Sequence, residues 1–229
     1  MGDELELRTA WSAIAPMTGR SGEVFDDLIA RHRQPHRRYH GVRHVVWVLR
    51  HVRELEAAMP ECRDEQAYDA VAVAAAAFFH DAIYDATRAD NEERSAVLAE
   101  HQLASIGWDE ARTGVVASLV RETAMHVSDD AATPPAGLPA PSATERHVLL
   151  DADLAVLGSE PAAYAAYATG VRVEYGHLTD DIWRSGRVSV LRRLLDRRSL
   201  YGSAPAREWW EARARANLTA ELAALVPNG

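Results

Sequence analysis

Cysteine is almost absent from this 229-residue chain, and several features that mark particular protein classes are missing altogether. The single cysteine, Cys62, excludes an internal disulfide and fits a reducing compartment. The N-terminal stretch MGDELELRTAW lacks the apolar core of a signal peptide, and Glu6 breaks the pattern for N-myristoylation. No apolar run approaches the roughly 20 residues that a membrane span needs. We therefore expect a cytoplasmic protein that does not enter a membrane.

An excess of basic residues is also missing, because the chain carries a formal net charge of −9. A negative field repels long polyanions, so binding along a nucleic-acid backbone is not expected. A small phosphorylated ligand remains compatible if a metal ion or local arginines offset the charge. With 48% hydrophobic residues the chain can bury one good core, and we expect a single domain over residues 1–229.

Strand-type alternation and internal repeats are absent, whereas helical periodicity is present in nearly every segment. The stretch VVWVLRHVRELEAAM has apolar residues at helical spacing, and Pro60 stops it. The alanine-rich run that follows predicts a helix from Asp64 or Glu65 to about Ile83, since alanine favours helices over strands. The pattern predicts an all-α fold.

Capping residues set the expected bounds of the remaining helices. Asp90 is expected to begin a helix that Gly107 ends, and Asp109 to begin another that reaches about Val127. The proline-rich segment 128–143 is expected to be an insertion loop within the domain. Helices are expected near 144–157, 161–176, 179–197 and 205–225. The result is a bundle of about eight to ten helices.

Four short stretches place imidazoles and carboxylates at helix ends or on one helix face. They are YHGVRH with His40 and His44, FFHD with His80 and Asp81, TAMH with His126, and LLDADLAVLG with Asp151 and Asp153. Burial of unpaired carboxylates is costly, and a divalent cation would compensate their charge. Nitrogen and oxygen donors without a thiolate suit Mn, Fe, Co, Ni, Zn or Mg.

Each stretch also has a structural interpretation when it is taken alone. His80 and Asp81 could form a solvated helix end, and His40 with His44 could begin a surface helix. His126 could be a hydrogen-bonded residue at a helix end, and Asp151 a helix cap or a core ion pair. Their joint occurrence, in this order and across several helices, favours a shared metal site.

The order His, His-Asp, Asp resembles the HD superfamily of metal-dependent phosphohydrolases. YHGVRHV resembles the Tyr-His-x-x-x-His start also found in cyclic-nucleotide phosphodiesterases. FFHDAIYD followed by NEERSA, together with DADLAVLG and VRVEY, resembles a group of small bacterial predicted HD phosphohydrolases. The resemblance covers about residues 35–200 and leaves 201–229 as a C-terminal helix. It implies a single HD-type helical domain.

The resemblance also implies roles for individual residues. His44, His80 and Asp81 would be metal ligands, and the last ligand would be Asp151 or Asp153. The Ala-Asp-Leu at 152–154 resembles that of phosphodiesterases and favours the second of these aspartates. His40 would be the general acid toward the leaving oxygen. His126 falls where some members place a histidine for a second metal or for substrate, although the paired downstream histidines of dinuclear members are missing.

Other residues near these motifs could contact substrate. Arg37 and Arg43 flank the YHGVRH stretch and could bind a phosphate through bidentate hydrogen bonds, or form a solvated face. Arg172 and Tyr175 share one helix face and could orient substrate, or serve as an ion pair and a packed phenol. Glu92 could support a metal-bound histidine or a second metal, or be favoured by the helix dipole.

The chemistry expected from these residues is metal-assisted hydrolysis of a small phosphate ester or a nucleotide-like substrate. A bound cation would lower the pKa of water toward about 7, Asp81 would orient that water, and His40 would donate a proton. One alternative is a di-iron HD-type oxygenase with His126 and Asp151 as extra ligands. Another is a non-catalytic helical metal-binding or sensor domain. Tryptophans 209 and 210 are expected to pack on the core or on the partner in a homodimer.

Overall fold

The described part of the chain consists of ten α-helices and three short 3-10 helices, without strands, which confirms the all-α prediction. The computed structural model describes residues 2–126 and 140–226, and of Met125 and His126 only the backbone. The α-helices are α1 (Asp3–Ile14), α2 (Gly19–His32), α3 (Val42–Ala58), α4 (Ala70–Phe79), α5 (Asn91–Ser105), α6 (Glu110–Glu122), α7 (Ala143–Leu154), α8 (Pro161–Glu174), α9 (Asp180–Asp196) and α10 (Ala204–Leu225). The 3-10 helices are η1 (Pro60–Arg63), η2 (Thr123–His126) and η3 (Ala155–Gly158).

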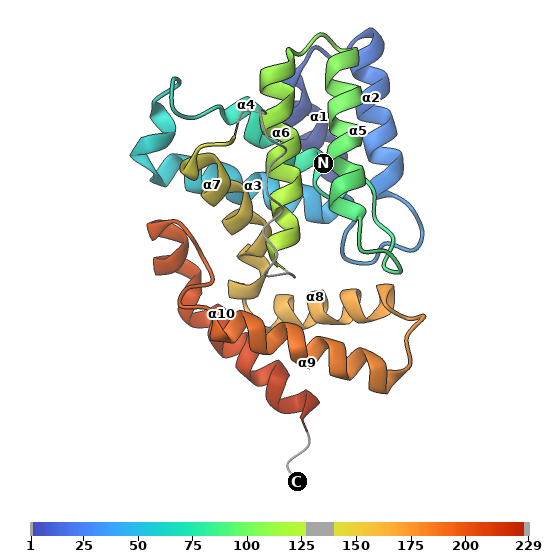
Figure 1. The fold of residues 1–229 in the computed structure, drawn as a ribbon, viewed down its shortest axis with the longest axis vertical. Coiled ribbons are helices and arrows are strands. Elements are labelled where there is room, and N and C mark those ends of the chain that lie inside the picture. Colours follow the sequence, from blue (N-terminus) through green and yellow to red (C-terminus); the bar gives the residue numbers. More distant parts are fainter. Residues whose placement is uncertain (1, 127–139, 227–229) are drawn as a thin grey trace.

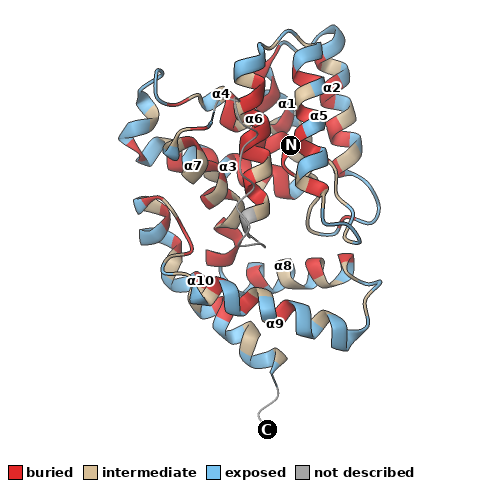
Figure 2. Ribbon diagram, viewed as in Figure 1, coloured by how far each residue is buried: buried red, intermediate tan, exposed pale blue. Residues whose placement is uncertain are grey.

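The helices form two groups. Helices α1 to α7 make one body, and α8, α9 and α10 form a layer along one side of it (Figure 1). Buried residues gather in α3, α4 and α6 at the middle of the larger body (Figure 2). Four aromatic rings, Trp11, Phe25, Phe78 and Phe79, meet there with centroids 5.2 to 6.4 Å apart. Helix α4 is therefore the centre of the core, and its C-terminal end reaches the polar stretch that follows.

Helix α4 is shorter at both ends than its composition predicts. It begins after Asp69, whose carboxylate accepts hydrogen bonds from the backbone N–H of Val71 and Ala72, so the start expected at Asp64 or Glu65 was wrong. It ends at Phe79 rather than near Ile83. His80 consequently caps the helix and Asp81 lies in the following turn, outside the helical repeat.

Several other predicted helix bounds agree with the structure. Asp109 caps α6 through the backbone N–H of Arg112, as expected. Asp90 precedes α5, but its carboxylate binds the Arg88 guanidinium instead of the helix N-terminus. The four helices expected after residue 143 correspond to α7 with η3, α8, α9 and α10. Most of the expected insertion loop at 128–143 lies outside the described residues.

Helix α10 packs closely against the segment that follows α7. A Cβ added at Gly158 would lie 2.4 Å from the Cβ of Trp210, so only glycine allows this approach. Trp210 is buried, while Trp209 is 39% exposed. The C-terminal helix expected at 201–229 is α10, which connects the layer of α8, α9 and α10 to the larger body through this packing. None of the helices in the described part of the chain combines the length and the hydrophobicity that crossing a bilayer requires.

Candidate metal centre

Two histidines and two aspartates from three helical segments meet at the edge of the larger body. The Nε2 atoms of His44 and His80 lie 2.9 Å apart. An oxygen of Asp81 lies 3.3 and 3.2 Å from these two nitrogens, and an oxygen of Asp153 lies 3.1 and 3.6 Å from them. Four donor atoms within such distances could surround one cation, and His44, His80 and Asp153 form a group able to hold a metal ion.

Helix ends explain why these side chains converge. His44 lies in the first turn of α3, His80 caps α4, and Asp153 lies in the last turn of α7. Successive residues of a continuous helix point in different directions, but α4 ends at Phe79. His80 and the adjacent Asp81 can therefore face the same point. The imidazoles are 1% exposed and the carboxylates 14 to 16%, so solvent reaches the group from the carboxylate side.

The hydrogen-bond partner of Nδ1 of His80 leaves the lone pair on its Nε2 atom available. Nδ1 of His80 lies 3.0 Å from the carbonyl oxygen of Ala77, to which it donates, so its Nε2 is free to act as an acceptor or ligand. Burial lowers the pKa of His44, but hydrogen bonds with Asp153 and Asp81 outweigh it and raise that pKa to about 10. The same carboxylates also raise the pKa of His80 against the effect of its burial.

The two carboxylates favour positive charge on the two imidazoles, and the short distance between the Nε2 atoms limits how many protons can supply it. Both carboxylates promote protonation of both imidazoles, yet two nitrogens 2.9 Å apart leave room for only one hydrogen between them. One imidazolium against two carboxylates leaves these four side chains with a net negative charge, with the Arg37 guanidinium as the nearby cation. A divalent cation with two neutral imidazoles would balance it. The residues present therefore fit a divalent metal of the kind that binds nitrogen and oxygen donors.

A second histidine arrangement adjoins this group. The His40 ring lies 5.6 Å from that of His44 and 4.3 Å from that of Tyr84, on which it stacks. Its Nδ1 lies 2.6 Å from an oxygen of Glu174, which also accepts a hydrogen bond of 2.9 Å from the Tyr84 hydroxyl. Because a carboxylate faces Nδ1, that nitrogen carries the hydrogen and Nε2 remains for chemistry. His40 is not on the helix with His44, as the spacing suggested, but in the loop before it.

Glu174 is the residue that organises this loop. Its other oxygen accepts three backbone hydrogen bonds, of 2.6, 2.7 and 3.0 Å, from Arg38, Tyr39 and His40. Burial raises the pKa of Glu174, but the bonds from His40 and from the backbone outweigh it and lower the pKa to about 2. The sequence interpretation noted Glu174 within VRVEY but gave roles only to its neighbours Arg172 and Tyr175. The available signal was an acidic residue near a predicted helix C-terminus, where the helix dipole disfavours negative charge.

Arg37 and Arg43, two of the four predicted substrate-contacting residues, lie elsewhere. The Arg37 guanidinium is buried and donates hydrogen bonds to the backbone carbonyls of His40, Asp81 and Ala82. It therefore contacts the backbone of the site. The Arg43 side chain is 94% exposed and lies 3.7 Å from the carboxylate of Asp3. Arg43 thus takes the solvated position stated as its alternative, whereas Arg37 takes a buried position that neither interpretation described.

Arg172 and Tyr175 also take structural positions. Arg172 binds the carbonyl of Tyr175 and the carboxylate of Asp180, closing the turn between α8 and α9. The Tyr175 ring packs on Trp183 at a centroid distance of 5.3 Å. These contacts correspond to the structural alternative stated for both residues, rather than to substrate orientation.

Asp151 is not part of the metal centre, although it is two residues from Asp153. Its two oxygens accept hydrogen bonds of 2.7 Å from the backbone N–H of Gly202 and Ser203, at the start of α10. Of the two aspartates offered as the last ligand, Asp153 is therefore the one that lies in the group, and the carboxylate of Asp151 binds a helix N-terminus instead. Glu92 is partly buried in the first turn of α5 and is outside the group that could hold a metal. The side chain of His126 lies outside the described residues.

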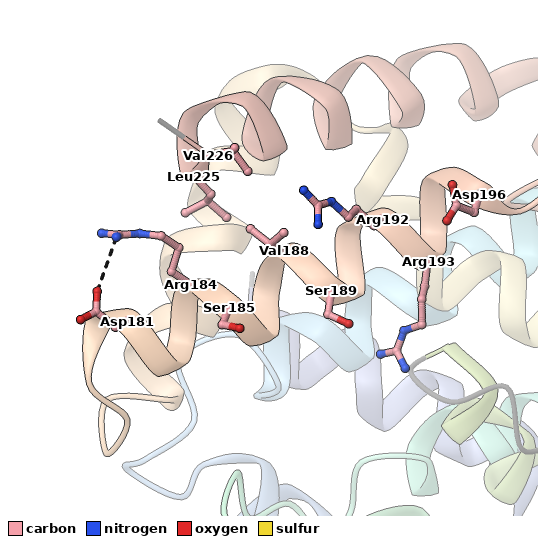
Figure 3. Close-up of a pocket in the computed structure, with 10 residues that line it drawn as sticks. All are labelled: Asp181, Arg184, Ser185, Val188, Ser189, Arg192, Arg193, Asp196, Leu225 and Val226. Carbon is pink, nitrogen blue, oxygen red and sulfur yellow. Dashed lines mark ion pairs between the residues drawn. The ribbon is translucent and has the colours of Figure 1, made fainter. Parts of the chain in front are cut away.

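Two hollows lie at different parts of the molecule, one beside α9 and α10 and the other beside Tyr84 and Glu174. A groove of about 530 Å³ between α9 and the end of α10 is lined by Arg192, Val188 and Leu225 among others (Figure 3), and it contains no residue of the metal centre. A cavity of about 510 Å³ is lined in part by Tyr84 and Glu174, which hold His40. The second hollow thus borders the two residues that hold His40, while none of His44, His80, Asp81 and Asp153 lines either hollow.

Comparisons of this chain with known protein families, with curated proteins and with solved structures found no match. The role of the metal centre is accordingly inferred from its own geometry and charge.

Proposed function

We propose that this chain is a metal-dependent hydrolase of a small phosphate ester or a nucleotide-like substrate. The observation that carries the proposal is the arrangement of His44, His80, Asp81 and Asp153 around one point, with the His40–Glu174 pair beside it. A cation site flanked by a proton-donating histidine is what hydrolysis of a phosphate ester requires. The motif order of the HD superfamily agrees with this arrangement.

Each residue has a defined part in the proposed reaction. His44, His80, Asp81 and Asp153 would hold the cation, which when bound would activate water and draw charge from a phosphoryl oxygen. Nε2 of His40 would transfer a proton to the leaving oxygen. Glu174 would keep the His40 ring in place through its 2.6 Å contact with Nδ1. The hollow beside Tyr84 and Glu174, which none of the four proposed ligands lines, would receive the part of the substrate that is not hydrolysed.

The two alternatives have less support from the described residues. A di-iron oxygenase needs further ligands, and Asp151 is already bound to the N-terminus of α10. A structural or sensory metal site would surround its ion fully, whereas the carboxylates of this group are 14 to 16% exposed. A single metal ion, its identity among Mn, Fe, Co, Ni, Zn and Mg, the cytoplasmic location and the homodimer stay predictions.

A screen of the purified protein separates these functions. Metal content is measured first, and phosphate release is then followed for phosphomonoesters and phosphodiesters with Mn, Co, Ni, Mg and Zn, under anaerobic conditions. We expect metal-dependent release that is lost in Asp153→Asn and retained in Asp151→Asn, two substitutions of the same kind only two residues apart. Oxygen uptake with iron, without anaerobic phosphate release, would support the oxygenase instead.

A further inference from the structure

Arg37 is a buried cation without a direct anionic partner. It is 7% exposed, and among the described residues none places a carboxylate within ion-pair distance of its guanidinium. Arg187 is equally buried but forms a two-fold ion pair with Glu221, at 2.7 and 2.9 Å. Burying a guanidinium without such a partner is unfavourable unless other groups satisfy it. Arg37 is satisfied instead by backbone carbonyls and Gln34, with the charges of Asp81 and Glu174 acting at longer range.

Those contacts join the two halves of the candidate site. One terminal nitrogen of Arg37 donates to the carbonyl oxygens of His40, at 3.0 Å, and of Asp81, at 2.5 Å. The other donates to the carbonyl of Ala82 at 3.0 Å. The fixed planar fork of arginine suits several acceptors at once, which a lysine ammonium does not reproduce. One side chain thus holds the backbone of the predicted proton donor and that of a predicted metal ligand.

Neighbouring residues keep the fork in position. The Nε of Arg37 donates to the side-chain oxygen of Gln34 at 3.2 Å. His32 is 2% exposed, lies 3.4 Å from a terminal nitrogen of Arg37 and contacts the carbonyl of Phe78 at 3.2 Å. The Arg37 charge also lies over the Tyr84 ring at 5.6 Å. These contacts restrict the guanidinium to one orientation, in which it faces the carbonyls.

We propose that Arg37 is a positioning residue that fixes the distance between His40 and the metal centre by binding the backbone on both sides. The inference deepens the proposed function and rests on it for the activity readout. It concerns a residue that touches neither substrate nor cation. Without the fork, the loop at 33–41 and the turn at 81–82 would keep their own folds but lose their relative placement.

The test compares Arg37→Lys with Arg187→Lys, a matched change at an equally buried arginine. Both variants are expected to lower the melting temperature. Only Arg37→Lys is expected to change the visible spectrum of the Co²⁺-substituted protein, which reports on the geometry of the ligands. It is also expected to lower kcat for a phosphomonoester at least tenfold while KM stays within twofold. Wild-type kcat and Co²⁺ spectrum in Arg37→Lys would overturn the inference.

Two further measurements keep the test decisive. If Arg37→Lys does not fold, the arginine Nε–H signals of the wild type are followed by NMR during titration with Co²⁺ or Zn²⁺. The Arg37 signal should shift while that of Arg187 stays, and an unmoved Arg37 signal contradicts the inference. If the wild type hydrolyses no phosphate ester, the proposed function fails, whereas the Co²⁺ spectrum and the NMR shift still decide the role of Arg37.

Discussion

Replacement of Glu174 by glutamine tests the charge that orders the His40 loop. The hydrogen bonds of Glu174 lower its pKa from the ordinary value of 4.5 to about 2. A difference of about 2.5 units corresponds to ~3 kcal/mol of extra stability for the folded state at pH 7. The Glu174 side chain is fully buried, so solvent does not screen this contribution. Glu174→Gln removes the charge and turns an amide N–H toward His40 or Tyr84.

The expected loss in free energy of unfolding is about 3 kcal/mol at pH 7, measured by urea denaturation of wild type and variant. The sign follows from the lowered pKa. Stability from the carboxylate is complete above pH 4.5 and declines as pH falls toward 2, because the unfolded chain then binds the proton first. The difference between the two proteins should therefore shrink by about 2 kcal/mol by pH 3.

Asp181→Asn serves as the control, because that carboxylate is 92% exposed and its removal from the first turn of α9 should cost less than about 1 kcal/mol. A Glu174→Gln difference below about 1 kcal/mol at pH 7 would refute the reasoning, since the five hydrogen bonds would then not favour the ionised form. A difference that does not depend on pH would refute it as well, because packing rather than charge would explain the loss.

Three other changes test the surrounding structure. Asp151→Asn should lower the free energy of unfolding by about 1–3 kcal/mol, because the amide NH₂ would face one of the two backbone N–H groups that the carboxylate now accepts from, while metal content measured by mass spectrometry stays at the wild-type level. Gly158→Ala should cost about 1–3 kcal/mol in the same denaturation assay, since its Cβ would meet the backbone of Trp210 at 2.9 Å, and an unchanged midpoint contradicts that packing. Tyr84→Phe should reduce kcat for a phosphomonoester while changing KM less, because Glu174 loses the hydrogen bond from the Tyr84 hydroxyl and His40 keeps its stacking partner.

The helices could be predicted because their signals are local. Prolines 161 and 205 lie in the first turns of α8 and α10, as their fixed backbone angle allows. The start of α4 could not be placed, because Asp64, Glu65 and Asp69 are all plausible caps by residue type. Only Asp69 has tertiary support, from Arg112 and from Glu145, which contacts its backbone N–H. Choosing between caps required contacts between distant parts of the chain.

The candidate site was predictable to the extent that motifs mark it. His44, His80, Asp81 and Asp153 were all named from sequence and lie together. Asp151 and Asp153 could not be separated by residue type, since one binds the start of α10, about fifty residues further along the chain. Glu174 received no role from the sequence because its partners, Arg38 to His40, are 134 to 136 positions away. Local patterns carry no record of such contacts.

The most direct test of the account is a titration of the metal-stripped protein with Mn²⁺, Co²⁺, Ni²⁺ and Zn²⁺ by calorimetry, for wild type, His80→Ala and Asp151→Asn. We predict one tightly bound equivalent in the wild type and in Asp151→Asn, and a large loss of affinity in His80→Ala. Wild-type affinity in a folded His80→Ala variant, or no binding of any of these ions by the wild type, would contradict the assignment of His44, His80, Asp81 and Asp153 as a metal centre.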